Sequence, residues 1–382
     1  MDFKNRIKKT ITAYKGLSTL GLSHIISSGM NAVLWFIVAA ISGPEGYGEI
    51  GFYIAIALIS SVVATPGISN TLLVYSNKDE KINSSLFGFA MVLIIISSII
   101  IIFIVNNFST SLFFLGYSIF GLVTTDIISK KLFAQFLKIT VIQRIFSIIL
   151  AISLYHMIGI EGVIFGLAFS YLVFIPKFIV ILKKHPIDLN ILKKYKIFML
   201  NNYGFDINSI LTSQLDKILI FPLYGSLILG NYYLAFQVLT ISSVLPGTVY
   251  QYLLTSETKE KSFKNLKLIT IIFPIILSII VIILSPIIFP IFFPDYLQVV
   301  GLIQIMILAM IPQTINLMYI AKFMTTGNSR IALNGSILFI ISQVLGIIIL
   351  GEILDTLGLA IALILGNVVQ FIYYSIKFKL SI

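Results

Sequence analysis

Residues 48–81, GEIGFYIAIALISSVVATPGISNTLLVYSNKDEK, decide the fold, because their pattern returns later in the chain. Residues 230–261 read GNYYLAFQVLTISSVLPGTVYQYLLTSETKEK. Both stretches begin with glycine, carry Ser-Ser-Val before Pro-Gly, and end in Glu-Lys. The matching residues lie 182 positions apart before the proline and 180 from the proline onward, which one two-residue slip explains. The sequence therefore predicts an internal duplication. Chance similarity between two serine-rich apolar helices is the alternative.

The charged residues follow a topological pattern. All but two of the 26 lysines and arginines fall in alternate gaps between hydrophobic runs. The intervening gaps hold acidic residues instead, namely Glu45, Glu49, Glu161, Asp295, Glu352 and Asp355. Cationic loops are retained on the cytoplasmic side during insertion. With 58% hydrophobic residues, 11% charged residues and a mean hydropathy of +1.04, the chain is predicted to be an all-α polytopic membrane protein with both termini in the cytoplasm.

The hydrophobic runs give the expected organisation. A helix needs about 20 apolar residues to cross a bilayer. The first run is about 26 residues long, whereas a signal-peptide core has roughly 7–15, so we expect it to be a retained span. We predict about twelve spans, at 16–41, 50–75, 84–105, 109–128, 139–158, 162–182, 199–222, 229–254, 266–289, 297–321, 331–350 and 357–376.

The repeat places the second span opposite the eighth, six spans later. This spacing predicts two six-helix lobes of the same orientation around a central cavity, residues 1–182 and 199–382. The basic segment between them, 183–198, is expected to be an amphipathic linker on the membrane surface.

Composition and motifs exclude several classes of function. The net charge of +11 is spread over short loops, which suits an anionic membrane leaflet rather than nucleic acid. There is no cysteine, so disulfides and thiolate metal sites are excluded. The sequence has no phosphate-binding GxxxxGK[ST] loop, no GxSxG or HExxH motif, and no histidine or carboxylate spacing typical of a metal site. We therefore expect no cofactor.

The seventh span carries the clearest polar face. Asn202, Asp206, Ser209, Ser213 and Asp216 are spaced by four, three, four and three residues, so they share one side of a helix. In lipid, such a face must meet protein or water. We predict that it lines the cavity, and helix–helix packing is the alternative.

Other spans carry milder polar faces, which we expect to line the same cavity. They comprise His24, Ser27, Ser28 and Asn31 in span one, Thr140, Gln143, Arg144 and Ser147 in span five, Gln237 and Gln251 in span eight, and Gln313 and Asn316 in span ten.

Two cations, Arg144 and Lys217, lie inside hydrophobic runs and are predicted to attract an anionic substrate. Asp206 and Asp216 would neutralise them or carry a coupling proton or sodium ion. The alternatives are snorkelling of Arg144 to the membrane surface and a structural Asp216–Lys217 pair, or placement of that pair in the outer interface. Adjacent helical residues do not face each other, so we expect Asp216 and Lys217 to have other partners. Asp126 is expected to cap or pair at the end of span four.

Three stretches of the chain together resemble a known family. They are ISGPEGYGEIGFYIAIALISS (41–61), LDKILIFPLYGSLILGNYYLAFQVLTISSVLPG (215–247) and TTGNSRIALNGSI (325–337). The pattern resembles the Wzx-type O-antigen and capsule-unit flippases of the multidrug/oligosaccharidyl-lipid/polysaccharide (MOP) exporter superfamily. The recurrent features of that family correspond to Gly43, Gly46, Tyr47 and Gly48 in an outer turn, Asp216 and Lys217 closing span seven, and Gly230 and Tyr232 opening span eight. Lipid II flippases typically have two further spans, which argues against that identity.

The resemblance implies a transporter and not an enzyme. It would move polyprenyl-pyrophosphate-linked oligosaccharides, of the O-antigen, lipopolysaccharide or capsule type, to the outer leaflet of the bacterial inner (cytoplasmic) membrane. Alternating access and coupling to a proton or sodium gradient, as in an antiporter, are the expected mechanism. A polysaccharide polymerase and a chain-length regulator are the expected protein partners. Two other classes stay open: a membrane polymerase or glycosyltransferase, which would need a sizeable outer loop, and a drug or cation exporter of the same superfamily.

Overall fold

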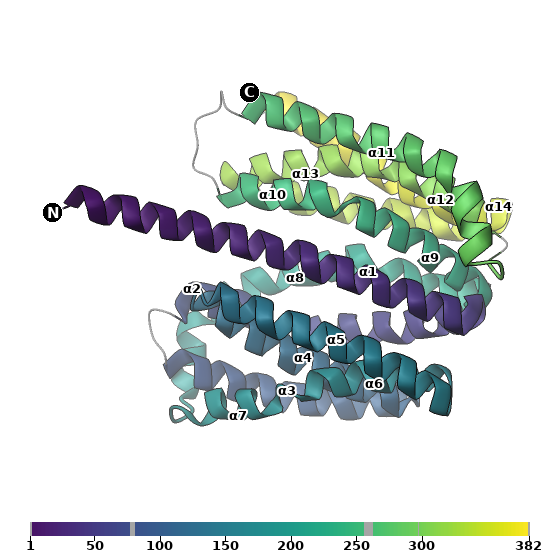
Figure 1. Ribbon diagram of the computed structural model, residues 1–382. Helices are drawn as coiled ribbons and strands as arrows, with labels where there is room; N and C mark the ends of the chain where they lie inside the picture. Colours follow the sequence, from purple (N-terminus) through teal and green to yellow (C-terminus); the bar gives the residue numbers. More distant parts are fainter. Residues whose placement is uncertain (1, 77–80, 256–262, 297, 381–382) are drawn as a thin grey trace. The chain divides into compact units, whose positions relative to one another are not determined.

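The computed structural model describes residues 2–76, 81–255, 263–296 and 298–380, and almost all of them are helical (Figure 1). The helices are α1 (Asp2–Val63), α2 (Ile68–Tyr75), α3 (Lys81–Val105), α4 (Phe108–Ser129), α5 (Phe133–Ile158), α6 (Ile160–Leu172), α7 (Ile175–Lys183), α8 (Leu189–Tyr224), α9 (Ser226–Ser242), α10 (Val244–Thr255), α11 (Phe263–Phe292), α12 (Val299–Met306), the short η2 (Ile307–Ala309), α13 (Met310–Thr325) and α14 (Ser329–Leu380). The predicted all-α class is confirmed.

The helices account for the predicted spans. Eight helical stretches in the described ranges are long and apolar enough to cross a membrane. Helix α9 and the start of α10 are bent by 47° at their junction, and they make a ninth stretch when the two are taken as one span. Two of the eight contain a kink, at Gly43 in α1 and at Asp355 in α14, so each holds two predicted spans. Helix α8 is not among these apolar stretches, because its polar residues lower its mean hydropathy. With α8 included, the described helices match the twelve predicted spans.

The first turn of each half has the same backbone conformation. Gly43 has φ 65° and ψ 176°, and Gly225, which lies 182 positions later, has φ 86° and ψ 173°. Glycine reaches this region without the steric cost that a Cβ imposes. The repeat seen at residues 48–81 therefore extends back to the turn before it.

The helices that follow these two turns touch each other through repeated residues. A Cβ on Gly48 would overlap the carbonyl oxygen of Ser226, and a Cβ on Gly230 would overlap the carbonyl oxygen of Pro44. Gly230 and Ser226 lie 182 positions after Gly48 and Pro44. The contact between α1 and α9 is thus reciprocal, because each side supplies the same two positions of the repeat.

The last hairpin of each half also repeats, at a spacing of 196 residues. Gly159 (φ 70°, ψ −144°) turns the chain between α5 and α6, and Asp355 (φ 53°, ψ −135°) does so inside α14. Just beyond these turns, Gly162 lies against the carbonyl of Leu154, and Gly358 lies against that of Leu350. Glycine at both places lets two helix backbones approach closely.

The described helices group into two compact units. The first unit consists of Met1–Leu34 and Ile56–Ile207, and the second of Trp35–Ala55 and Asn208–Ile382. The chain passes between units inside α1 and inside α8. These boundaries differ from the predicted lobes 1–182 and 199–382, because residues 35–55 pack on α9 through the reciprocal glycine contact. The lobes and the cavity between them stay predictions.

The predicted surface linker 183–198 lies partly in a helix. Helix α8 begins at Leu189 and runs without a break into the seventh span. The short connection before it docks on the start of α3, where the Oγ of Ser84 accepts from the amide of His185 at 3.1 Å and the Oγ of Ser85 accepts from the amide of Asp188 at 3.0 Å. Residues 189–198 of the predicted linker are therefore helical and continuous with the rest of α8, and their place on a membrane surface stays a prediction.

Candidate functional site

Helix α8 carries the predicted polar face on one continuous helix. Ser209 is exposed, Asn202, Asp206 and Ser213 are half-buried, and Asp216 is buried. Asn202 and Ser213 donate to carbonyls one turn earlier on their own helix, at 2.8 and 3.0 Å. The middle of the face, at Asp206 and Ser209, is therefore not fully buried.

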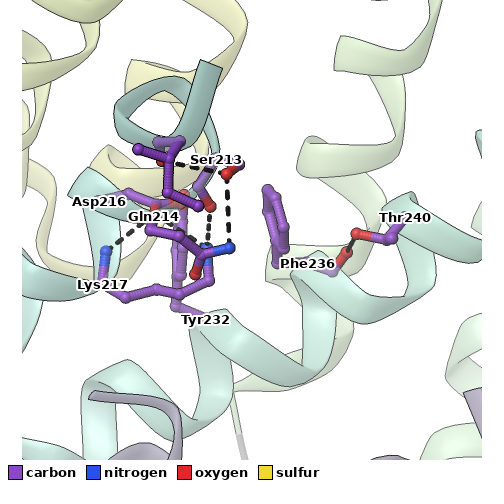
Figure 2. A network of polar contacts seen from close by, with 8 residues as sticks. Ser213, Gln214, Asp216, Lys217, Tyr232, Phe236 and Thr240 are labelled. Carbon is purple, nitrogen blue, oxygen red and sulfur yellow. Dashed lines mark hydrogen bonds and ion pairs between the residues drawn. The ribbon is translucent and has the colours of Figure 1, made fainter. Parts of the chain in front are cut away.

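At its C-terminal end, the face closes into a buried ionic cluster in the second unit (Figure 2). The Nζ of Lys217 lies 2.9 Å from Oδ1 of Asp216, and both side chains are 2% exposed. The Nζ also donates to the carbonyl of Ser213 at 2.7 Å and lies 4.1 Å from the ring centre of Phe236. The hydroxyl of Tyr232 donates to Oδ2 of Asp216 at 2.8 Å.

This geometry corrects one expectation from the sequence. Asp216 and Lys217 are adjacent, yet they pair with each other, because the long lysine side chain folds back along the helix toward Ser213. Each also has the further partners that were expected, Tyr232 for the aspartate and Phe236 for the lysine. The arrangement matches the structural ion pair that the sequence left open as an alternative. Here Lys217 offers no unpaired charge to a substrate.

Asp206 has a different environment, in the first unit. Both of its carboxylate oxygens accept from the amide nitrogen of Asn70 on α2, at 2.9 and 3.1 Å. One turn away, the hydroxyl of Tyr203 donates to the carbonyl of Val63, at the break between α1 and α2, at 3.2 Å. Asp206 is thus held by an uncharged group beside a helix break, whereas Asp216 is held by a cation.

Arg144 and Gln143 on α5 have different surroundings despite being neighbours. Gln143 is 1% exposed and its amide nitrogen donates to Ser147 at 2.7 Å and to Ser170 on α6 at 3.0 Å. Arg144 is half-buried, and its charge acts on Tyr117 of α4. Gln143 therefore lies in helix–helix packing, and Arg144 keeps part of its surface accessible.

The remaining predicted residues are dispersed. Ser27 and Asn31 are half-buried on α1 in the first unit. Gln237 is 7% exposed on α9 in the second unit, beside Tyr47 and Tyr233. His24 and Gln251 lie outside the residues whose side chains are described. The proposed cavity role of these residues stays a prediction.

Three residues complete these sites, and sequence reasoning missed two of them and gave the third, Tyr232, no role there. Asn70 binds Asp206, Tyr232 binds Asp216, and Phe236 lies over Lys217. Asn70 and Phe236 carry no local signal, because each meets its partner only after helices pack. Tyr232 could have been found from the Gly-x-Tyr at the start of span eight. Asp126 behaves as predicted, since it pairs with Lys130 at 2.7 Å.

Comparison with known proteins gives a likeness of fold. No protein-family model matches the sequence, and no curated protein matches it. Among solved structures, "Lipid II flippase MurJ, inward closed conformation" is similar with a TM-score of 0.78 and 16% identity, over 94% of this chain and 87% of that one. An inward-facing multidrug resistance MATE family transporter of the MOP superfamily is similar with a TM-score of 0.73 and 13% identity, over 94% and 98%. A MATE structure in the bent conformation gives 0.65 and 12%, over 96% and 95%.

These likenesses extend over nearly the whole chain. Because the sequence identities are low, the likenesses show a shared fold and nothing about function. They agree with the fold that the resemblance implied. The chain therefore has the fold shared by the lipid II flippase and the multidrug transporters of the MOP superfamily.

Proposed function

We propose that this chain is a flippase that moves polyprenyl-pyrophosphate-linked oligosaccharides, of the O-antigen or capsule type, from the cytoplasmic to the outer leaflet by alternating access. The polar face of α8 carries the proposal, because it leaves Ser209 exposed and Asp206 half-buried on a helix within a membrane fold. Sugars and phosphates need such a surface, since an isolated charge in hydrocarbon costs of order tens of kcal/mol in the Born limit. A fold shared with a lipid II flippase supports this class of substrate.

Arg144 is the residue proposed to contact the pyrophosphate. It is half-buried on α5, and no hydrogen bond or ion pair to it is found among the described residues. An arginine can bind two phosphate oxygens at once through its planar guanidinium. Lys217 is proposed to act indirectly, by holding Asp216 and the outer end of the α8 face in place.

Asp206 is proposed as the site of the coupling ion, a proton or sodium. Its carboxylate is held only by an amide among the described residues, so its charge is not matched by a cation there. The charge of Asp216 is already matched by Lys217. Of the two candidate carboxylates, Asp206 is the one that can gain stabilisation from an added cation.

The test is translocation of a fluorescent polyprenyl-pyrophosphate oligosaccharide in vesicles containing the purified protein. We expect Arg144→Ala to slow translocation at least tenfold, and Lys138→Ala, which removes a charge from an exposed position of the same helix, to leave it unchanged. We expect Asp206→Asn to abolish the response to an imposed ion gradient. Translocation by Arg144→Ala at the rate of the unmodified protein would refute the role of this arginine.

A cation exporter is the second candidate, because MATE transporters share the fold and Asp206 is a half-buried carboxylate. Competition decides between the two. Efflux of an organic cation that the glycolipid does not inhibit would favour the exporter. A membrane polymerase is tested in the same vesicles, where lengthening of the oligosaccharide would show a transferase.

A further inference from the structure

A buried carboxylate lies at the end of the first unit that is predicted to be cytoplasmic. Asp126, at the C-terminal end of α4, is 3% exposed. It accepts from the amide nitrogen of Asn83 on α3 at 2.8 Å and pairs with the Nζ of Lys130 at 2.7 Å. Asn83 also donates to Ser76 at 2.8 Å. One lysine therefore already matches the charge of this carboxylate.

A second lysine lies within electrostatic range of the same carboxylate. Lys177 on α7 interacts electrostatically with Asp126 and with Lys130. Its backbone is fixed by two buried rings on the same helix turn. Phe174 lies 5.0 Å from Phe120 of α4, and Phe178 lies 5.0 Å from Phe87 of α3, measured between ring centres. The two ring contacts therefore hold the backbone on either side of Lys177 against α4 and α3.

A third lysine occupies a position that normally favours glycine. Lys131 has φ 58°, directly after α4, and the amide of Leu132 bonds back to the carbonyl of Ile127 at 3.1 Å. This is the helix-ending geometry in which glycine is preferred, because a Cβ costs about 1–2 kcal/mol there. The chain thus places a further exposed positive charge beside Lys130 at a conformational cost.

The charges at this site do not balance. Among the described residues, Lys130 pairs with Asp126, Lys177 interacts with both of them, and Lys131 follows Lys130 in the chain. These three lysines carry two more positive charges than Asp126 neutralises. Lys130 keeps 29% of its side chain exposed and still has N–H groups free to donate. The neighbouring surface is apolar, with Val180 68%, Val173 57% and Leu132 47% exposed. In a membrane protein, a basic site beside an apolar surface suits the binding of lipid phosphates.

We propose that Lys130, Lys131 and Lys177 bind the phosphate of a membrane lipid at this end of α4 and α7, with the headgroup of an anionic phospholipid as the occupant. Asp126 acts as a positioning residue, because it holds the Lys130 ammonium and limits the net charge of the site. The proposal does not depend on what the chain transports.

The test is native mass spectrometry of the purified protein in mixed micelles of phosphatidylglycerol and phosphatidylcholine. We expect Lys177→Met to weaken retention of phosphatidylglycerol about fivefold, the effect of removing one lysine near an anionic surface. The matched control is Lys193→Met, an exposed lysine on α8, which we expect to bind as the unmodified protein does. Equal retention by the two variants would overturn the proposal.

The variant Asp126→Asn is expected to change the retention of phosphatidylglycerol in the opposite direction. The variant frees Lys130, so we expect tighter retention of phosphatidylglycerol together with a lower thermal midpoint. A pair that is only structural would lower the midpoint and leave retention unchanged. If this variant does not fold, the Lys177 comparison still decides. In the same assay, preferential retention of polyprenyl pyrophosphate, lost in Lys177→Met, would reassign the site to the phosphate of the transported lipid.

Discussion

Lys217 illustrates how a buried charge in a membrane helix is stabilised within one unit. Its ammonium has a carboxylate, a backbone carbonyl and an aromatic ring as neighbours. Lysine has three N–H donors and no acceptor, so these contacts match its chemistry. The cluster therefore contributes mainly to the structure of the C-terminal end of α8.

We predict that the two charges depend on each other. Asp216→Asn or Lys217→Met alone should lower the free energy of unfolding by about 3–5 kcal/mol, because each leaves the other charge buried without its partner. The double variant should lose less than the sum of the two. SDS-induced unfolding of the purified protein measures all three. Additive losses would show that the pair is not coupled.

The same residues show what sequence reasoning can reach. Lys130 lies four residues after Asp126, the spacing at which helical side chains meet, so that pair could be predicted. The Asp216–Lys217 pair could not, because it depends on a side chain folding back against Phe236 from another helix. Gln143 and Arg144 belong to one predicted face, yet only α6 determines that Gln143 becomes buried.

At the scale of elements, α8 combines two environments on a single helix. Its first part contacts α2 through Asp206, and its last part packs against α9 through Asp216. The residue spacing placed these polar residues on one helix, as the structure has them, and they lower the hydropathy of that helix. The helix begins at Leu189, inside the predicted linker, because the basic residues there are also good helix formers.

We predict that water reaches the middle of the α8 face. The chain has no cysteine, so single cysteines can be introduced cleanly. Ser209→Cys should react with a membrane-impermeant maleimide. Leu200→Cys, at an exposed position nine residues earlier and so on the opposite side of the helix, should react far more slowly. Equal protection of both positions would assign the face to helix packing or lipid.

For the whole molecule, the duplication is the feature that the sequence predicted and the structure extended. The Ser-Ser-Val and Pro-Gly signals mark breaks in both halves, between α1 and α2 and between α9 and α10. The sequence did not reveal the equivalence of Gly159 and Asp355, because glycine and aspartate share no chemical pattern and only the backbone angles relate them.

We predict equal costs for equivalent substitutions in the two halves. Gly162→Ala and Gly358→Ala should each destabilise the protein by about 1–3 kcal/mol, because the new methyl group meets the backbone of the neighbouring helix. Their effects should add, since the two glycines lie in different units. Gly121→Ala, in open space on α4, is the control and should be neutral or mildly stabilising. Thermal midpoints that move for only one of the pair would contradict the equivalence.

The reciprocal contact of Gly48 and Gly230 bears on the origin of the chain. A contact in which both sides supply the same two positions is one that two identical subunits can form with each other. An ancestral gene that encoded a single half could therefore have produced a homodimer in which two copies already made this reciprocal glycine contact. Fusion of two gene copies would then have kept an existing interface, and the later divergence of each copy needed only to spare these small residues.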